Sequence, residues 1–234
     1  GYRMGHDKIY DHMMLDGLED AYEPGRSMGT FGEDCAAKYS FTRAEQDHFA
    51  TTSVQRAKAA TESGAFAAEI TPVTVKDRSG ERVVSIDEGP GKVKLDKITS
   101  LKPAFKKDGT ITAASSSSIN DGAAALVLAR ASTAKALGAK PIARIVGHAT
   151  FAQAPEWFTT APVGAVQKLL KNIGWSVKDV DLWEVNEAFA VVPMAAMKEL
   201  GISHDIVNVN GGACALGHPI GASGARIIVT LLYA

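Results

Sequence analysis

The sequence has 234 residues, of which 46% are hydrophobic, and its formal net charge is −1. Such a chain is long enough for one large domain or two smaller ones, and its balanced charge gives no reason to expect nucleic acid as a main partner. Two cysteines are too few for a disulfide framework, so we expect a reducing, cytoplasmic setting. We find no apolar run of membrane-spanning length and no opening signal peptide, so no membrane partner is expected.

The first helices are predicted close to the amino terminus. Apolar residues recur at helical spacing over 6–22, and a loop containing Pro24 and Gly25 ends that segment. A short helix is expected over 32–38. The sequence opens like the interior of a longer one and stops inside an apolar helix, so both ends look truncated.

A long helix and a hairpin are predicted next. Thr42 begins a capping-box sequence, Thr-Arg-Ala-Glu, and Gly64 suits the position just after the last helical turn. Apolar residues alternate on both sides of a turn at 77–80, which predicts a β-hairpin over 73–86.

A lysine-rich segment occupies residues 91–107. Its six lysines accompany one acidic residue, Asp96, which leaves a local excess of five positive charges. A solvated loop accounts for such a run, and so does a site for a polyanionic small molecule; both interpretations stay open. Four serines at 115–118 then lead into 120–128, which we expect to be a buried strand rather than part of a linker.

The remainder of the chain alternates predicted strands and helices. Strands are expected over 142–146 and 180–185, and an amphipathic helix over 162–172. The segment 188–200 is apolar nearly all round, so it should form a buried helix. This order of elements predicts a layered α/β fold.

A glycine-rich stretch, 211–226, lies between a predicted strand at 206–210 and a final helix. Five glycines occur in the fourteen residues 211–224, and His218 stands among them, held by Pro219. An imidazole on a stiff loop is suited to act as a general base. A phosphate-binding or purely structural turn is the alternative, and neither is excluded.

Asn186 stands where a predicted strand ends and the buried helix begins. It is therefore either a helix cap or a site residue, and Glu187 beside it is interpreted as a structural hydrogen-bonding carboxylate. The six histidines lack paired ligand spacing, so no metal site is expected.

Three motifs stand out in the second half of the chain. They are Val-Asn-Glu-Ala-Phe-Ala at 185–190, Asn-Val-Asn-Gly-Gly-Ala at 208–213 and Gly-His-Pro-Ile-Gly-Ala-Ser-Gly-Ala-Arg at 217–226. These motifs resemble the thiolase family, and within it the acetyl-CoA acetyltransferases. Further matching segments are 28–29, 102–105, 112–114, Ser117 and 120–124. The resemblance covers the whole chain, and family members are longer at both ends.

The resemblance implies an incomplete thiolase-like α-β-α-β-α fold, made of two similar halves with a loop domain inserted in the first. Residues 1–118 would be the coenzyme A (CoA)-binding loop domain. Residues 119–135 would end the N-terminal half, and residues 136–234 would form most of the C-terminal half. Thiolases are dimers or tetramers, so a homodimer or homotetramer is implied.

The resemblance also implies a reaction, the reversible condensation of two acetyl-CoA molecules to acetoacetyl-CoA and CoA. His218 matches the histidine that activates a cysteine nucleophile. With a water held by Asn186, it would also stabilise the enolate oxygen. CoA thioesters are substrates here, and no cofactor is implied.

Other positions match residues that line the CoA and acyl channel in the family, and the lysine-rich segment would lie beside the CoA phosphates. The implied substrate contacts are Leu18, Met28, Phe105, Ala113, Ser117, Ile119, Phe158, Ala188 and Phe189. Ser27, Pro90 and Ser115 differ from common family residues, which bears on CoA affinity.

The family's Cys-Gly-Ser-Gly nucleophile and Cys-x-Gly-Gly-Gly acid/base motifs are absent, and neither Cys35 nor Cys214 matches them. We therefore expect the chain alone to be inactive, with the full-length parent being the enzyme. The alternatives are a longer-chain 3-ketoacyl-CoA thiolase and a non-catalytic CoA- or acyl-CoA-binding protein on a thiolase scaffold.

Overall fold

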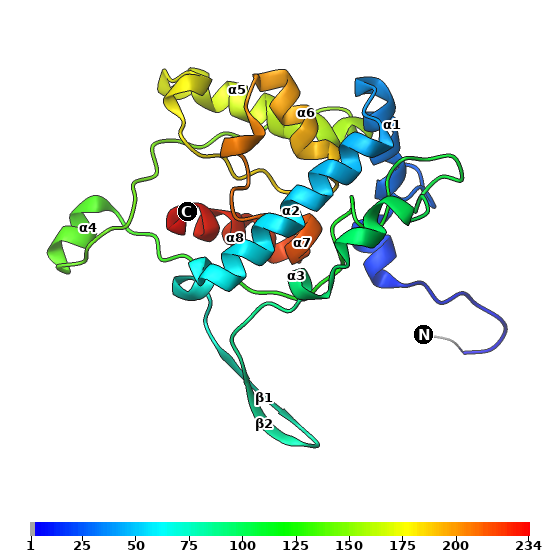
Figure 1. Ribbon diagram of the computed structural model, residues 1–234, viewed down its shortest axis with the longest axis horizontal. Helices are drawn as coiled ribbons and strands as arrows, with labels where there is room; N and C mark the ends of the chain where they lie inside the picture. Colours follow the sequence, from blue (N-terminus) through cyan, green and yellow to red (C-terminus); the bar gives the residue numbers. More distant parts are fainter. Residues whose placement is uncertain (1–2) are drawn as a thin grey trace.

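The computed structural model describes residues 3–234 as a helical body from which a hairpin and the short helix α4 project (Figure 1). Its α-helices are α1 Met28–Tyr39, α2 Arg43–Ser63, α3 Gly89–Lys92, α4 Ala131–Ala136, α5 Ala161–Ile173, α6 Val191–Leu200, α7 Ala213–Leu216 and α8 Ile220–Tyr233. The strands are β1 Val73–Asp77 and β2 Gly80–Val84. A π-helical turn, η1, spans Met14–Leu18, and 3₁₀ turns are η2 Ala65–Ala68, η3 Leu95–Ser100, η4 Pro155–Thr160, η5 Val177–Asp179 and η6 His204–Ile206.

The predictions based on local signals are confirmed for α2 and the hairpin. The hydroxyl of Thr42 accepts from the Glu45 amide at 3.2 Å, and the Glu45 carboxylate accepts from the Thr42 amide at 2.7 Å, which completes the capping box. Gly64 follows α2 with φ +77°, a left-handed conformation that suits glycine. β1 and β2 pair antiparallel, with Val75 opposite Arg82.

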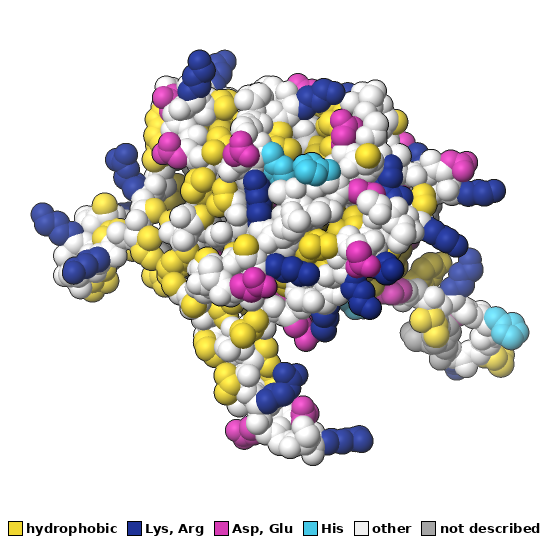
Figure 2. All heavy atoms as spheres, viewed as in Figure 1, with side chains coloured by type: hydrophobic (Ala, Val, Ile, Leu, Met, Phe, Trp, Pro, Cys, Tyr) yellow, Lys and Arg dark blue, Asp and Glu magenta, His cyan; other side chains and the backbone are white. Residues whose placement is uncertain are grey.

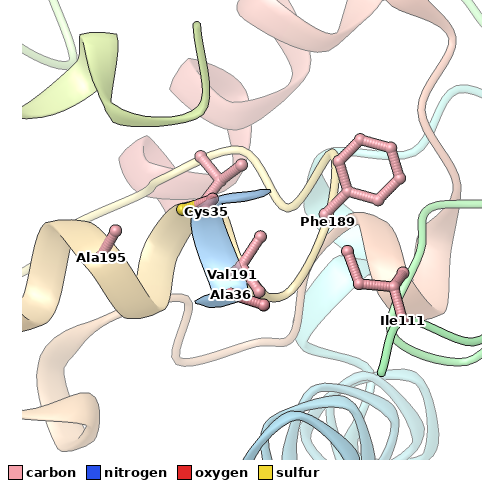
Figure 3. Packing of buried hydrophobic residues seen from close by; sticks show 7 residues of the cluster. Cys35, Ala36, Ile111, Phe189, Val191 and Ala195 are labelled. Carbon is pink, nitrogen blue, oxygen red and sulfur yellow. The ribbon is translucent and has the colours of Figure 1, made fainter. Parts of the chain in front are cut away.

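The largest core cluster joins α1 to α6 and the residues just before α6. Cys35 and Ala36 come from α1, and Ile111 and Phe189 lie beside them from loops, as Figure 3 shows. A Cβ at Gly29 would overlap the Phe105 ring, so a glycine is needed where that ring approaches α1. The core therefore packs directly against several of the implied substrate contacts.

The predictions of strands over 120–128 and 142–146 are wrong. Both segments belong to no strand, and large apolar side chains in each are exposed to solvent, with Val127 99% and Ile142 68% exposed. A strand needs a hydrogen-bonded neighbour for its backbone groups. No strand pairs with either segment within residues 3–234, so their apolar pattern cannot produce buried strands there.

The strands expected over 180–185 and 206–210 are reduced to one parallel bridge, Trp183 to Val207. Asn208 ends the pairing because its φ of +49° turns the backbone away. Its side-chain amide then takes the next two hydrogen bonds, accepting from the Val185 amide and donating to the Val185 carbonyl, each at 2.8 Å.

Three helix boundaries also differ from expectation. The helix expected over 32–38 is α1, which begins four residues earlier, at Met28. Over 6–22 the regular helical segment is confined to the η1 region, and Ile9 is 90% exposed, because this segment packs no apolar face on the core. α6 begins at Val191 rather than 188 because the Ala190 amide donates to the Ser115 carbonyl at 2.8 Å. α5 agrees with its prediction: it ends at Ile173, and Gly174 follows as its C-cap.

The visible face carries acidic and basic side chains that are intermixed, and hydrophobic side chains are exposed along the hairpin (Figure 2). Val73 and Val83 on the hairpin are 58% and 66% exposed. In the part of the chain described here, every helix is too short or too polar to cross a membrane.

The domain boundaries that the thiolase resemblance implies, at residues 118 and 135, stay a prediction.

Candidate active site

A sharp turn between α7 and α8 carries His218. Gly217 there has φ +84°, and a Cβ on it would overlap the Asn120 side chain, so glycine satisfies both the backbone and the space. The His218 amide donates to the Ser118 carbonyl at 3.0 Å. This bond attaches the turn to the serine run at 115–118 and limits where the imidazole can point.

The imidazole of His218 lies between two polar side chains. Its Nε2 is 3.3 Å from Asn186 Nδ2, and its Nδ1 is 2.6 Å from Ser223 Oγ. Burial lowers the pKa of His218, and the positive charge of Arg226 lowers it further. The imidazole is therefore neutral at pH 7, the form that accepts a proton.

Asn186 is not a helix cap. α6 begins five residues later, and its N-cap, Ala190, has no side-chain capping bond. The Asn186 Oδ1 atom is buried and lacks a hydrogen-bond partner within residues 3–234, which is unusual for a buried amide. Of the two interpretations drawn from the sequence, the structure excludes the helix cap, and the site role stays a prediction.

Glu187 organises the backbone that carries both site residues. It is 1% exposed and accepts hydrogen bonds from Ser53 Oγ at 2.7 Å, Asn208 Nδ2 at 2.9 Å and the Cys214 amide at 2.9 Å. A Cβ at Gly212 would overlap this carboxylate. Glu187 is therefore a structural carboxylate that joins α2, the 185–190 segment and α7.

The serine run is a connector between the two halves of the site. Ser116 and Phe189 form an antiparallel bridge, and Ser117 donates to the Ala188 carbonyl through both its amide, at 3.1 Å, and its hydroxyl, at 2.9 Å. Ser118 bonds to the His218 turn. Four residues that suggested a linker by composition thus connect the 185–190 segment to the turn that carries His218.

A cavity of about 490 Å³ opens beside this connector, a size typical of small-molecule sites. Lys92, Lys94 and Lys97 line it, so half of the lysine-rich cluster gathers there. Lys106 lies elsewhere, 2.9 Å from Asp34 on α1. The remaining wall includes two acidic residues, Asp87 and Glu88, of which Glu88 pairs with Lys92 at 2.7 Å, together with Ser118, Asn120 and small or apolar side chains.

The implied substrate contacts fall into two groups. Those that pack in or on the α1–α6 core cluster are Met28, Phe105, Phe158, Ala188 and Phe189. Those that line the lysine cavity are Ala113 and Ile119, and Ser117 joins the two groups through Ala188. Leu18 lies apart from both, although its neighbour Gly17 faces Ile220 at the start of α8.

Neither cysteine is arranged as a nucleophile. Both are buried and free. Burial raises the pKa of Cys35, and burial together with the nearby Glu187 raises the pKa of Cys214 well above its ordinary value. The thiolate is the reactive form, so the structure disfavours its formation at either position.

Sequence reasoning missed the role of Ser223 at this site and the buried carboxyl of Glu184, which stands two residues before Asn186 in the sequence. Ser223 is 3% exposed and contacts the His218 ring from one turn into α8; a serine five residues after a loop histidine was the available signal. Both carboxylate oxygens of Glu184 are buried without a hydrogen bond in the described chain, and burial raises its pKa to about 8. Acidic, histidine and cysteine side chains form no metal-binding group within the described residues.

Two family models match the chain: the N-terminal domain of thiolase over residues 1–132 and the C-terminal domain of thiolase over residues 139–234. The chain belongs to the thiolase family. The thiolase resemblance of the sequence motifs is therefore confirmed.

Relatives of this thiolase chain include a probable acetyl-CoA acetyltransferase of Dictyostelium discoideum, 51% identical over 100% of the chain and 56% of the relative. An acetyl-CoA acetyltransferase of Chromobacterium violaceum is 50% identical over 100% of the chain and 60% of its own length. The crystal structure of the Bacillus anthracis acetyl-CoA acetyltransferase matches with a TM-score of 0.94 and 43% identity, over 100% of this chain and 59% of that one. The predicted thiolase-like α/β fold is confirmed, and the chain spans less than two thirds of these relatives.

Proposed function

We propose that this chain is the base-bearing part of an acyltransferase that condenses two acetyl-CoA molecules to acetoacetyl-CoA and CoA, with thiolysis as the reverse reaction. The observation that carries the proposal is the neutral imidazole of His218 facing the Asn186 amide at 3.3 Å. Homologues named acetyl-CoA acetyltransferase, at about half identity, support the choice of substrate.

Each residue of the pair has a distinct role in this proposal. His218 Nε2 accepts the proton of a thiol, which makes the thiol nucleophilic towards a thioester. Asn186 lies beside the same nitrogen and holds a water that donates to the enolate oxygen as its charge develops. Losing one such donor typically reduces the rate by about 10²–10³.

The lysine cavity is the proposed site of the CoA phosphates. Its three ammonium groups outnumber the two carboxylates of Asp87 and Glu88, and this excess of positive charge attracts a polyanion. Ala113 and Ile119 provide an apolar wall for the rest of the molecule. We expect calorimetry to detect CoA binding to the purified chain, and the triple variant Lys92→Ala, Lys94→Ala, Lys97→Ala to weaken it at least tenfold. An unchanged affinity for CoA in the triple variant would contradict the placement of the CoA phosphates in this cavity.

Catalysis needs a thiolate that the chain does not supply, so the purified chain by itself should not cleave acetoacetyl-CoA. Acetyl-CoA formation is measured by chromatography after incubation with acetoacetyl-CoA and CoA. Turnover by the isolated chain would refute our assignment of its cysteines. Comparing the thiolysis rates of acetoacetyl-CoA and longer 3-ketoacyl-CoA in the full-length parent tests the chain-length alternative. A parent protein that binds CoA but has no thiolase activity would favour the non-catalytic alternative.

We also propose that the protein is cytoplasmic and forms a homodimer or homotetramer. Two free, buried thiols suit a reducing compartment. Exposed apolar side chains such as Met4, Ile9 and Val127 suit burial in an assembly. Sedimentation equilibrium measures the oligomeric state, and a monomer at all concentrations would contradict self-association.

A further inference from the structure

Ser223 is placed to control the His218 ring. Its hydroxyl oxygen lies 2.6 Å from His218 Nδ1 and 3.1 Å from the Pro219 carbonyl oxygen. The side chain is 3% exposed, and α8 fixes its backbone because the Ser223 amide donates to the Pro219 carbonyl at 2.9 Å. This hydroxyl therefore has a defined position against one ring nitrogen.

The hydrogens can be assigned along one consistent chain of donors. The Ser223 hydroxyl donates to the Pro219 carbonyl, which only accepts, so the Ser223 oxygen is free to accept a hydrogen bond from the imidazole. The single ring proton then lies on Nδ1 and is donated to Ser223 Oγ. Nε2, beside the Asn186 amide, is then the nitrogen that carries the lone pair of a neutral imidazole.

We propose that Ser223 is a positioning residue that holds His218 in its Nδ1–H tautomer, so that Nε2 presents the lone pair to an incoming thiol. The inference rests on the proposed function for its purpose, but the tautomer itself is independent of substrate. The thiol proton moves to Nε2, its S–H bond breaks and the imidazolium keeps its Nδ1–H bond to Ser223. No ring rotation is needed.

A hydroxyl in this position differs from the carboxylate that orients histidine in a serine-protease triad. A carboxylate would add a negative charge and favour the imidazolium, whereas a neutral serine orients the ring without doing so. His218 has a lowered pKa, and the positive side chain near it is Arg226. Ser223 can therefore set the tautomer while the imidazole stays unprotonated at neutral pH.

The test is nitrogen-15 NMR of the histidine-labelled chain above the imidazole pKa. The two ring nitrogens of a neutral imidazole have different shifts, and His218→Gln identifies the resonances. We expect protonated Nδ1 and unprotonated Nε2 in the wild type. In Ser223→Ala the ratio of Nδ1–H to Nε2–H should fall about fivefold to tenfold, the equivalent of one net hydrogen bond, and Ser223→Thr should restore it.

Thr61→Val is the matched control. The Thr61 hydroxyl on α2 donates to the Ala57 carbonyl at 2.8 Å, four residues earlier, as the Ser223 hydroxyl does to Pro219, and the substitution removes it. It should leave the His218 ratio unchanged. A wild-type ring protonated at Nε2 would overturn the proposal, and so would an unchanged ratio in Ser223→Ala. The wild-type spectrum alone shows which tautomer His218 adopts, so the proposal is tested even if a variant fails to fold. A chain that does not bind CoA would contradict the proposed function but not the tautomer.

Discussion

Replacing Glu187 with glutamine should destabilise the chain by about 2–4 kcal/mol. The buried carboxylate accepts three hydrogen bonds, from Ser53, Asn208 and the Cys214 amide. Glutamine retains one acceptor oxygen and adds an NH₂ group that would face these donors. Hydrogen bonds to a charged group contribute about 1.5–3 kcal/mol, and a buried donor left unpaired costs about 1–3 kcal/mol. Rotation of the Ser53 hydroxyl recovers part of this loss.

Urea unfolding followed by tryptophan fluorescence measures the free energy of unfolding of Glu187→Gln. The control is Glu62→Gln, which makes the same change at an exposed position on α2 and should alter stability by less than about 0.5 kcal/mol. A loss below about 1 kcal/mol in Glu187→Gln, with an unchanged denaturant slope, would show that the carboxylate is not the organising group.

Three further changes test other parts of the structure. Thr42→Ala removes the capping box of α2 and should lower the free energy of unfolding by about 1 kcal/mol; an unaltered midpoint in urea would contradict this. Burial lowers the pKa of His204 from 6.5 to about 4, so its stabilising contribution is present above pH 6.5 and lost as the pH falls towards 4. His204→Gln should flatten that part of the stability–pH curve, and an equally steep curve would exclude His204 as its cause. Burial raises the pKa of Glu184 from 4.5 to about 8, so the contribution of Glu184 is present below pH 4.5 and lost as the pH rises through 8. Glu184→Gln should therefore gain stability relative to wild type over that range, on the order of 5 kcal/mol, and a constant difference would refute a buried neutral carboxyl.

Helices with local signals could be predicted from the sequence. The limits of α2 follow from Thr42 and Gly64, whose side-chain and backbone preferences act within one turn of the chain. The hairpin follows in the same way from a turn between alternating apolar residues. Such signals do not depend on what else the chain contacts, so they survive in the folded structure.

Strands could not be predicted in the same way because their stability is not local. The apolar residues over 120–128 and 142–146 have the right composition, yet no neighbouring strand within residues 3–234 completes their backbone hydrogen bonds. At 206–210 the left-handed Asn208 ends the pairing after a single bridge. Composition predicts that a segment can be a strand, and the partner decides whether it is one.

The geometry of the His218 site depends on contacts within this chain. The backbone around Asn186 is held by Asn208 on one side and by the serine run on the other, and that run also holds the His218 turn through Ser118. Ser223 holds the ring itself. None of these bonds involves a reacting thiol, so the base and its amide neighbour are oriented before any thiol or thioester arrives. In the proposed function His218 is the base, and a pre-oriented base avoids reorganisation during proton transfer, so these bonds within the chain would supply that orientation.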